Sequence, residues 1–170
     1  MARKFSGGEQ DRHINISLST HGIDLAIEAI ENYEAVLQEK CSLFCEEMAR
    51  RGAAYAQSEI RVMDAVDTGQ LMNSINIKPG DVIPNGATWI IYTDCPYAQY
   101  VEYGTGPRGQ EKPHPDGRGT YRSTPWVYYN DRIQKFLTTS GMGSRPFMYN
   151  TWEYLKTDKL VREVAKEVFG

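Results

Sequence analysis

The chain has 170 residues and a formal net charge of −3; 41% of its residues are hydrophobic and 24% are charged. This composition is that of a folded globular protein of about one domain, and it excludes a disordered chain. No apolar run approaches the ~18 residues of a membrane span, and the N-terminus lacks the apolar region of a secretory signal, so we expect synthesis in the cytosol. Because the chain is weakly acidic, binding to nucleic acid would need a local basic patch.

The N-terminal part is predicted to be an arm followed by a long helix. Residues 1–21 are rich in Ser, Gly and charge, which favours a mobile arm. The alternation of Ile14, Ile16 and Leu18 within it favours an edge strand instead. From residue 22 to about residue 55, apolar residues recur at helical spacing without a proline, which predicts an amphipathic helix of about 30–35 residues. Such a helix is longer than a small domain needs, so part of it could meet another subunit. A break near residues 50–52 is the alternative.

The rest of the chain predicts strands and a second helix. Residues 74–78 and 87–93 alternate as an antiparallel pair, and residues 126–129 and 133–138 indicate two more strands around a turn. Residues 104–124 form a long loop rich in Gly, Pro and charge, and the C-terminus has the pattern of an amphipathic helix. This order predicts an α+β fold with a long N-terminal helix, a small, mainly antiparallel sheet and a C-terminal helix, with residues 22–170 as one domain.

The cysteines and histidines give no pattern typical of a metal site. Cys41, Cys45 and Cys95 make an odd number, which argues against a disulfide framework. Cys41 and Cys45 lie four residues apart on the apolar stripe of the long helix, where free cysteines behave as small hydrophobic residues. Without a further Cys or His pair, we expect core residues rather than zinc ligands, and no cofactor. The three histidines are isolated among polar residues and are predicted to lie on the surface.

The best candidate for an enzyme's catalytic centre is a pair of carboxylates, Asp67 and Glu102. A glycan or cell-wall hydrolase would use two such groups, one to protonate the leaving group and one to assist attack. The structural alternatives are that Asp67 or Thr68 caps a short turn, and that Glu102 pairs with Arg145 or accepts backbone hydrogen bonds from the neighbouring loop. The sequence contains no nucleophile elbow, zinc-binding helix, phosphate loop or dinucleotide fingerprint.

A nucleic-acid contact would involve the long loop. It contains four basic residues, and the negative charges of Glu111 and Asp116 cancel two of their positive charges, which leaves a net charge of +2. Such a charge suffices only for weak contact that does not depend on base sequence, as in a loop that lines a channel for DNA. The basic residues are Arg108, Lys112, Arg118 and Arg122.

Three blocks resemble a known family when they are taken in order. They are VDTGQLMNSI at residues 66–75, YAQYVEYGTG at 97–106 and GMGSRPFM at 141–148. Together they resemble the head-tail joining or tail-completion proteins of long-tailed bacteriophages and prophages, also described as minor capsid or neck proteins. The resemblance covers roughly residues 22 to 168.

The resemblance implies a structural virion protein without a catalytic centre. It would form a ring, expected to be a hexamer, at the head-tail junction or the head-proximal end of the tail, after assembly in the host cytoplasm. Its partners would be copies of itself, a tail-tube or tail-terminator protein and a head-completion or connector protein, with at most transient DNA contact and no membrane. The tyrosines would supply core or subunit contacts. Residues 107–123 are predicted to be mobile in the free subunit and to order on assembly. The motif residues implied in folding and assembly are Asp67, Thr68, Gly69, Leu71, Ser74, Tyr97, Tyr100, Tyr103, Glu102, Gly104, Thr105, Arg145, Pro146 and Phe147.

Overall fold

The computed structural model describes residues 20–66, 68–81, 83 and 86–170. The chain divides into two compact units, residues 1–40 and 41–170, and the division falls inside helix α1 (Thr20–Val62). The predicted arm, including the alternating stretch at residues 14–18, lies outside the described residues, except that Thr20 and His21 already belong to α1. Among the described residues, no helix is long and apolar enough to cross a membrane.

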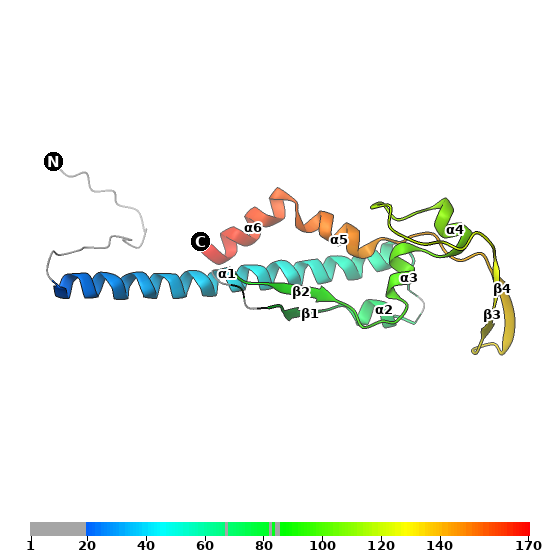
Figure 1. Ribbon diagram of the computed structural model, residues 1–170, viewed down its shortest axis with the longest axis horizontal. Helices are drawn as coiled ribbons and strands as arrows, with labels where there is room; N and C mark the ends of the chain where they lie inside the picture. Colours follow the sequence, from blue (N-terminus) through cyan, green and yellow to red (C-terminus); the bar gives the residue numbers. More distant parts are fainter. Residues whose placement is uncertain (1–19, 67, 82, 84–85) are drawn as a thin grey trace. The chain divides into compact units, whose positions relative to one another are not determined.

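Helix α1 has 43 residues and is longer than the sequence predicts. It continues through residues 50–52, so the alternative of a break there is wrong (Figure 1). Two ion pairs support the helix here, each between residues one helical turn apart. Arg50 pairs with Glu46 at 2.7 Å, and Arg51 pairs with Glu47 at 3.0 Å. Gly52 allows close packing: a Cβ there would lie 2.5 Å from Cδ1 of Ile91, so glycine lets strand β2 (Trp89–Tyr92) approach the helix.

The strands pair as predicted but form two separate sheets. β1 (Asn76–Pro79) is antiparallel to β2 (Trp89–Tyr92), and β3 (Trp126–Asn130) is antiparallel to β4 (Lys135–Thr139). Each sheet has two strands, and β2 and β3 are separated along the chain by two helices and a loop. β4 begins two residues later than expected because the side-chain oxygen of Asn130 accepts the backbone N–H groups of Arg132 and Ile133, which extends the turn.

The remaining helices change two of the predictions. α2 (Gln70–Asn73) and α3 (Ala98–Tyr103) are short, and α4 (Gly106–Glu111) lies within the segment predicted to be an irregular loop. The predicted C-terminal helix is two helices, α5 (Phe147–Leu155) and α6 (Asp158–Phe169). They are separated because the backbone of Thr157 is extended and its hydroxyl donates to the carbonyl of Tyr154 at 2.8 Å. The α+β class is confirmed.

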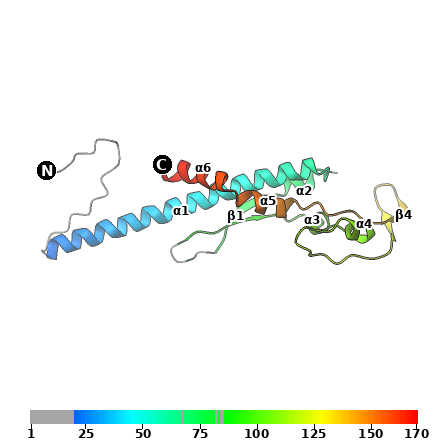
Figure 2. The ribbon, with the colours of Figure 1, turned by 90° about the horizontal axis from the view of Figure 1, so that it is seen from above.

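The core of residues 41–170 lies between the C-terminal half of α1, the short helices and α5. Figure 2 shows α5 and α6 running beside this half of α1, where the rings of Tyr55 and Tyr154 stack at 4.1 Å between centroids. Arg51 reaches α6 through Glu167 at 2.6 Å. The buried apolar residues of the core are Ala56, Ile60, Leu71, Ile75, Cys95, Ala98, Val101 and Phe147.

The cysteines behave as packing residues. Cys41 and Cys45, which are predicted to be core residues, are only half-buried, while Cys95 is a buried core residue. The thiol of Cys45 donates to the carbonyl of Ala87 at 3.5 Å. The pKa of this thiol is raised, mainly by burial and to a smaller extent by the neighbouring Cys41. No group of three or more potential metal ligands occurs within the part of the chain that the structure describes.

Candidate functional site

The three sequence blocks converge on one region of the fold. The first block contributes Leu71 and Ile75 to the hydrophobic core, the second contributes Ala98 and Val101, and the third contributes Phe147. These residues are separated by up to 76 positions in sequence, yet they belong to one buried cluster. The buried residues of the three blocks therefore form the core together, and the exposed residues of the same blocks contribute to the surface beside it.

The first block makes the turn between α1 and β1. Gly69 precedes α2 with a φ of 80°, and the hydroxyl of Thr68 accepts the backbone N–H of Gln70 at 3.3 Å. The hydroxyl of Ser74 donates to the carbonyl of Leu71 at 2.8 Å and lies 2.6 Å from the hydroxyl of Thr93. The turn is thus held by side-chain hydrogen bonds. Asp67, the other predicted cap, lies outside the described residues.

The second and third blocks cross at a backbone bridge. Thr105 and Met142 exchange both N–H to carbonyl hydrogen bonds, at 2.8 and 3.1 Å. Gly104 and Gly141 flank this bridge with φ values of 79° and 80°, in the left-handed region that favours glycine. A Cβ at Gly104 would lie 2.7 Å from the backbone nitrogen of Ser144, and a Cβ at Gly141 would collide with the carbonyl of Thr105. The glycines of both blocks are therefore required by the crossing.

Glu102 is buried at this crossing and caps α5. Its carboxylate accepts the backbone N–H groups of Met148 and Tyr149, both at 2.9 Å, in the first turn of that helix. The hydroxyl of Ser144 donates to the backbone carbonyl of Glu102 at 2.6 Å. A carboxylate at a helix N-terminus also interacts favourably with the helix dipole. The expectation that Glu102 pairs with Arg145 or accepts backbone hydrogen bonds from the neighbouring loop is wrong, because its backbone donors belong to α5 and the loop contributes the side chain of His114.

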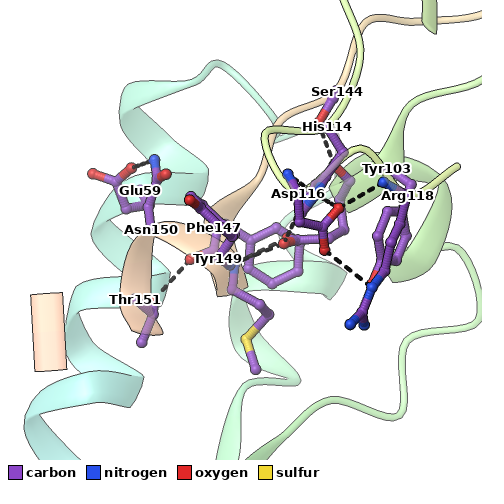
Figure 3. A network of polar contacts seen from close by, with 12 residues as sticks. Glu59, Tyr103, His114, Asp116, Arg118, Ser144, Phe147, Tyr149, Asn150 and Thr151 are labelled. Carbon is purple, nitrogen blue, oxygen red and sulfur yellow. Dashed lines mark hydrogen bonds and ion pairs between the residues drawn. The ribbon is translucent and has the colours of Figure 1, made fainter. Parts of the chain in front are cut away.

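His114 is a hydrogen-bond partner of Glu102, and the prediction that it is a surface histidine is wrong. It is 3% exposed, and its Nε2 lies 3.0 Å from Glu102. Its Nδ1 lies 2.5 Å from Asp116 (Figure 3). Its ring also packs against Tyr103, at 4.7 Å between centroids, and edge-on against Tyr149. Both ring nitrogens lie within hydrogen-bond distance of carboxylate oxygens. The imidazole thus joins the loop at residues 112–118 to α3 and α5.

Asp116 holds the outer side of this network. Burial acts to raise its pKa, but the backbone N–H of Arg118 and then the imidazole of His114 outweigh burial and leave the pKa below its usual range. Its Oδ1 accepts the Arg118 N–H at 2.8 Å, and the N–H of Gly117 donates to the carbonyl of His114 at 3.0 Å. The residues His-Pro-Asp-Gly are typical of such a turn, and this was the available signal that His114 is fixed in place.

An open apolar groove of about 570 Å³ lies beside this framework. The aromatic rings of Tyr97, Tyr100 and Trp126 line it, together with Met142 and Arg145. Residues from all three blocks contribute, so the blocks that build the core also surround this groove. A second depression of about 380 Å³ shares Tyr100, Thr105 and Trp126 with it. Grooves with aromatic walls and few polar groups suit apolar side chains of a partner.

Glu102, one member of the predicted carboxylate pair, is engaged in hydrogen bonds within the fold. Both of its oxygens already accept hydrogen bonds from backbone or imidazole, and the residue is 7% exposed. A general acid must reach its substrate within hydrogen-bond distance, directly or through one water. Asp67, the other member of the pair, is not among the described residues.

The four basic residues of the predicted loop are exposed, but two have partners in the chain. The guanidinium of Arg118 lies 3.5 Å from Asp116, and that of Arg122 lies over the ring of Trp126 at 5.6 Å. Arg108 is in α4, and Lys112 ends it. All four side chains are accessible to a partner or to DNA, although Arg118 and Arg122 already interact with Asp116 and Trp126.

The comparison with known proteins points to a phage family. Residues 26–104 match the model of the HK97-gp10-like family, described as "Bacteriophage HK97-gp10, putative tail-component". No curated protein and no solved structure matches the chain. The matched segment contains the first sequence block and residues 97–104 of the second, and it ends at Gly104, where the crossing with the third begins. The resemblance inferred from the blocks is confirmed: the chain is similar to a family of phage tail components, which supports a structural role in a virion.

Proposed function

We propose that the protein is a subunit of a ring, of six copies, that completes the head-proximal end of a phage tail and joins the tail to the head. The observation that carries this proposal is the match of residues 26–104 to the phage tail-component family. A tail has rotational symmetry, and a subunit that repeats around its axis needs surfaces for its neighbours in the ring and for the proteins above and below.

The exposed apolar surface of the chain supports this role. The β3–β4 hairpin is a separate two-stranded sheet whose Val127 and Phe136 side chains are 61% and 73% exposed. A two-stranded sheet is marginally stable in water by itself, and contiguous exposed apolar groups mark interaction sites. The groove lined by Tyr97, Tyr100 and Trp126 adds a concave surface. Both features suit a protein that is completed by its partners.

The buried polar network supports a structural role rather than catalysis. In an enzyme, a histidine between two carboxylates would face a substrate cleft, but His114 is 3% exposed and Glu102 caps a helix. The network therefore positions backbone segments relative to one another. We propose that the protein has no catalytic activity of its own.

Light scattering after size-exclusion chromatography tests the proposal. The protein should form a defined oligomer alone, or on addition of the tail-tube or the head-side connector protein from the same phage. A strict monomer in all these mixtures would contradict it. Digestion of purified cell walls by the wild-type protein, lost in a Glu102→Gln variant that remains folded, would contradict the non-enzymatic part.

A further inference from the structure

The N-terminal half of α1 carries an apolar stripe beside a strongly acidic surface. Ile23, Ile27, Ile30 and Leu37 follow one another at intervals of four, three and seven residues, which places them on one face of the helix. Their side chains are 40–50% exposed. Residues 21–40 contain five carboxylates and one basic residue, a net charge of −4.

The β3–β4 hairpin at residues 126–139 has an apolar face and a net charge of +1, from Arg132, Lys135 and Asp131, within a more basic segment of the chain. Because residues that pair across the strands share a face, Val127, Tyr129 and Phe136 lie on the same side of the sheet. The rings of Tyr129 and Phe136 meet edge-on at 5.1 Å, and all three residues are at least 47% exposed. Residues 105–145, which contain the hairpin, have seven basic and three acidic residues, a net charge of +4.

The acidic helix is not suited to pairing with its own copy. Two acidic helices side by side would place their like charges together, which disfavours a two-fold symmetric contact between them. The helix stripe and the hairpin face are complementary in charge, and a helix packed on a two-stranded sheet buries both apolar surfaces. The chain thus holds both halves of one interface.

We propose that the acidic helix at residues 21–40 of one subunit docks on the β3–β4 hairpin face of a second copy of this chain. A contact between two different surfaces is heterologous and propagates from copy to copy, so it closes a ring when the rotation permits. The inference rests on the proposed ring and names the surfaces that make it.

Photo-crosslinking of the full chain identifies the contact. Tyr33, which is 55% exposed on the acidic helix, is replaced by a benzoylphenylalanine residue in protein labelled with ¹⁵N, and this protein is mixed with unlabelled protein. Mass spectrometry should find crosslinks from the labelled helix to unlabelled peptides of residues 126–139. Crosslinks in oligomers that reach only other segments, or only the labelled chain itself, would overturn the proposal.

Paired substitutions test the chemistry of the contact. Phe136→Ser should weaken association about tenfold or more, whereas Val62→Ser, which removes a side chain that is 76% exposed elsewhere, should leave it unchanged. Glu28→Lys with Glu31→Lys should weaken association, and adding Arg132→Glu with Lys135→Glu should restore it. Circular dichroism checks that every variant is folded.

The outcomes separate this inference from the function on which it rests. If the wild type forms oligomers that neither Phe136→Ser nor the charge reversals affect, this interface is wrong while the ring-forming role stands. If the wild type associates neither with itself nor with the tail-tube protein, both are wrong.

Discussion

Replacing Glu102 by glutamine should destabilise the protein without changing its shape. The carboxylate accepts two backbone N–H groups of α5 at 2.9 Å and faces Nε2 of His114 at 3.0 Å. The side-chain amide of the variant would keep one acceptor oxygen, but its NH₂ group would face a donor. At least one buried donor is then left without an acceptor.

The magnitude follows from the hydrogen bonds that are lost. A hydrogen bond to a charged group contributes about 1.5–3 kcal/mol, and loss of the negative charge at the helix N-terminus costs up to about 1 kcal/mol more. We therefore expect Glu102→Gln to lower the free energy of unfolding by about 2–4 kcal/mol, a fall in Tm of roughly 6–12 °C. Urea denaturation measures the first quantity and calorimetry the second.

Glu153→Gln is the matched control. Glu153 lies on α5, its side chain is 48% exposed, and it pairs with Lys156 at 2.6 Å. An exposed pair contributes about 0.5 kcal/mol or less, so this variant should remain close to the wild type. Hydrogen exchange should also accelerate at the amides of Met148 and Tyr149 in Glu102→Gln only. A Glu102→Gln protein as stable as the control would refute the assignment of Glu102 as the cap of α5.

Three further predictions concern the same framework. Gly141→Ala should cost about 3 kcal/mol or more because its Cβ meets backbone, whereas Gly117→Ala, also at positive φ but with open space around it, should cost about 1 kcal/mol; equal losses in urea denaturation would contradict this. Since the pKa of Asp116 is lowered in the folded state, its stabilising effect is present above its unfolded pKa and is lost as pH falls through the folded value. Asp116→Asn should flatten the stability profile below about pH 4; an unchanged profile would count against the network. Arg51→Ala should lower Tm more than Arg50→Ala, because Arg51 pairs with α6 whereas the ion pairs of Arg50 stay within α1; the reverse order would contradict this.

The sequence predicts the elements that depend on local periodicity. The apolar repeat along α1 and the alternation in β1 to β4 are signals within a few residues of one another, and the pairing of neighbouring strands follows from the short turns between them. The alternative of a break at residues 50–52 is wrong because Gly52 packs against Ile91, a contact that a local pattern does not contain. The three sequence blocks predict the family, but only the fold shows that they share a core.

The role of His114 was not predictable from its neighbours in sequence. Its surroundings in the chain are polar, but its ring is buried by Tyr103 and Tyr149, which lie 11 positions before it and 35 after it. The same holds for Glu102, whose backbone donors are 46 and 47 positions away. Contacts at this separation depend on the tertiary fold. Motifs considered one at a time therefore predict a surface position for His114 and a catalytic pair for Glu102.

Removal of the chain from its phage tests the structural role most directly. The coding sequence is deleted in frame, the particles are examined by electron microscopy, and the wild-type chain is supplied in trans as the control. The proposed role in joining predicts filled heads and separate tails without infectious particles, and recovery of joined particles on complementation. Intact, infectious particles formed without the chain would contradict it.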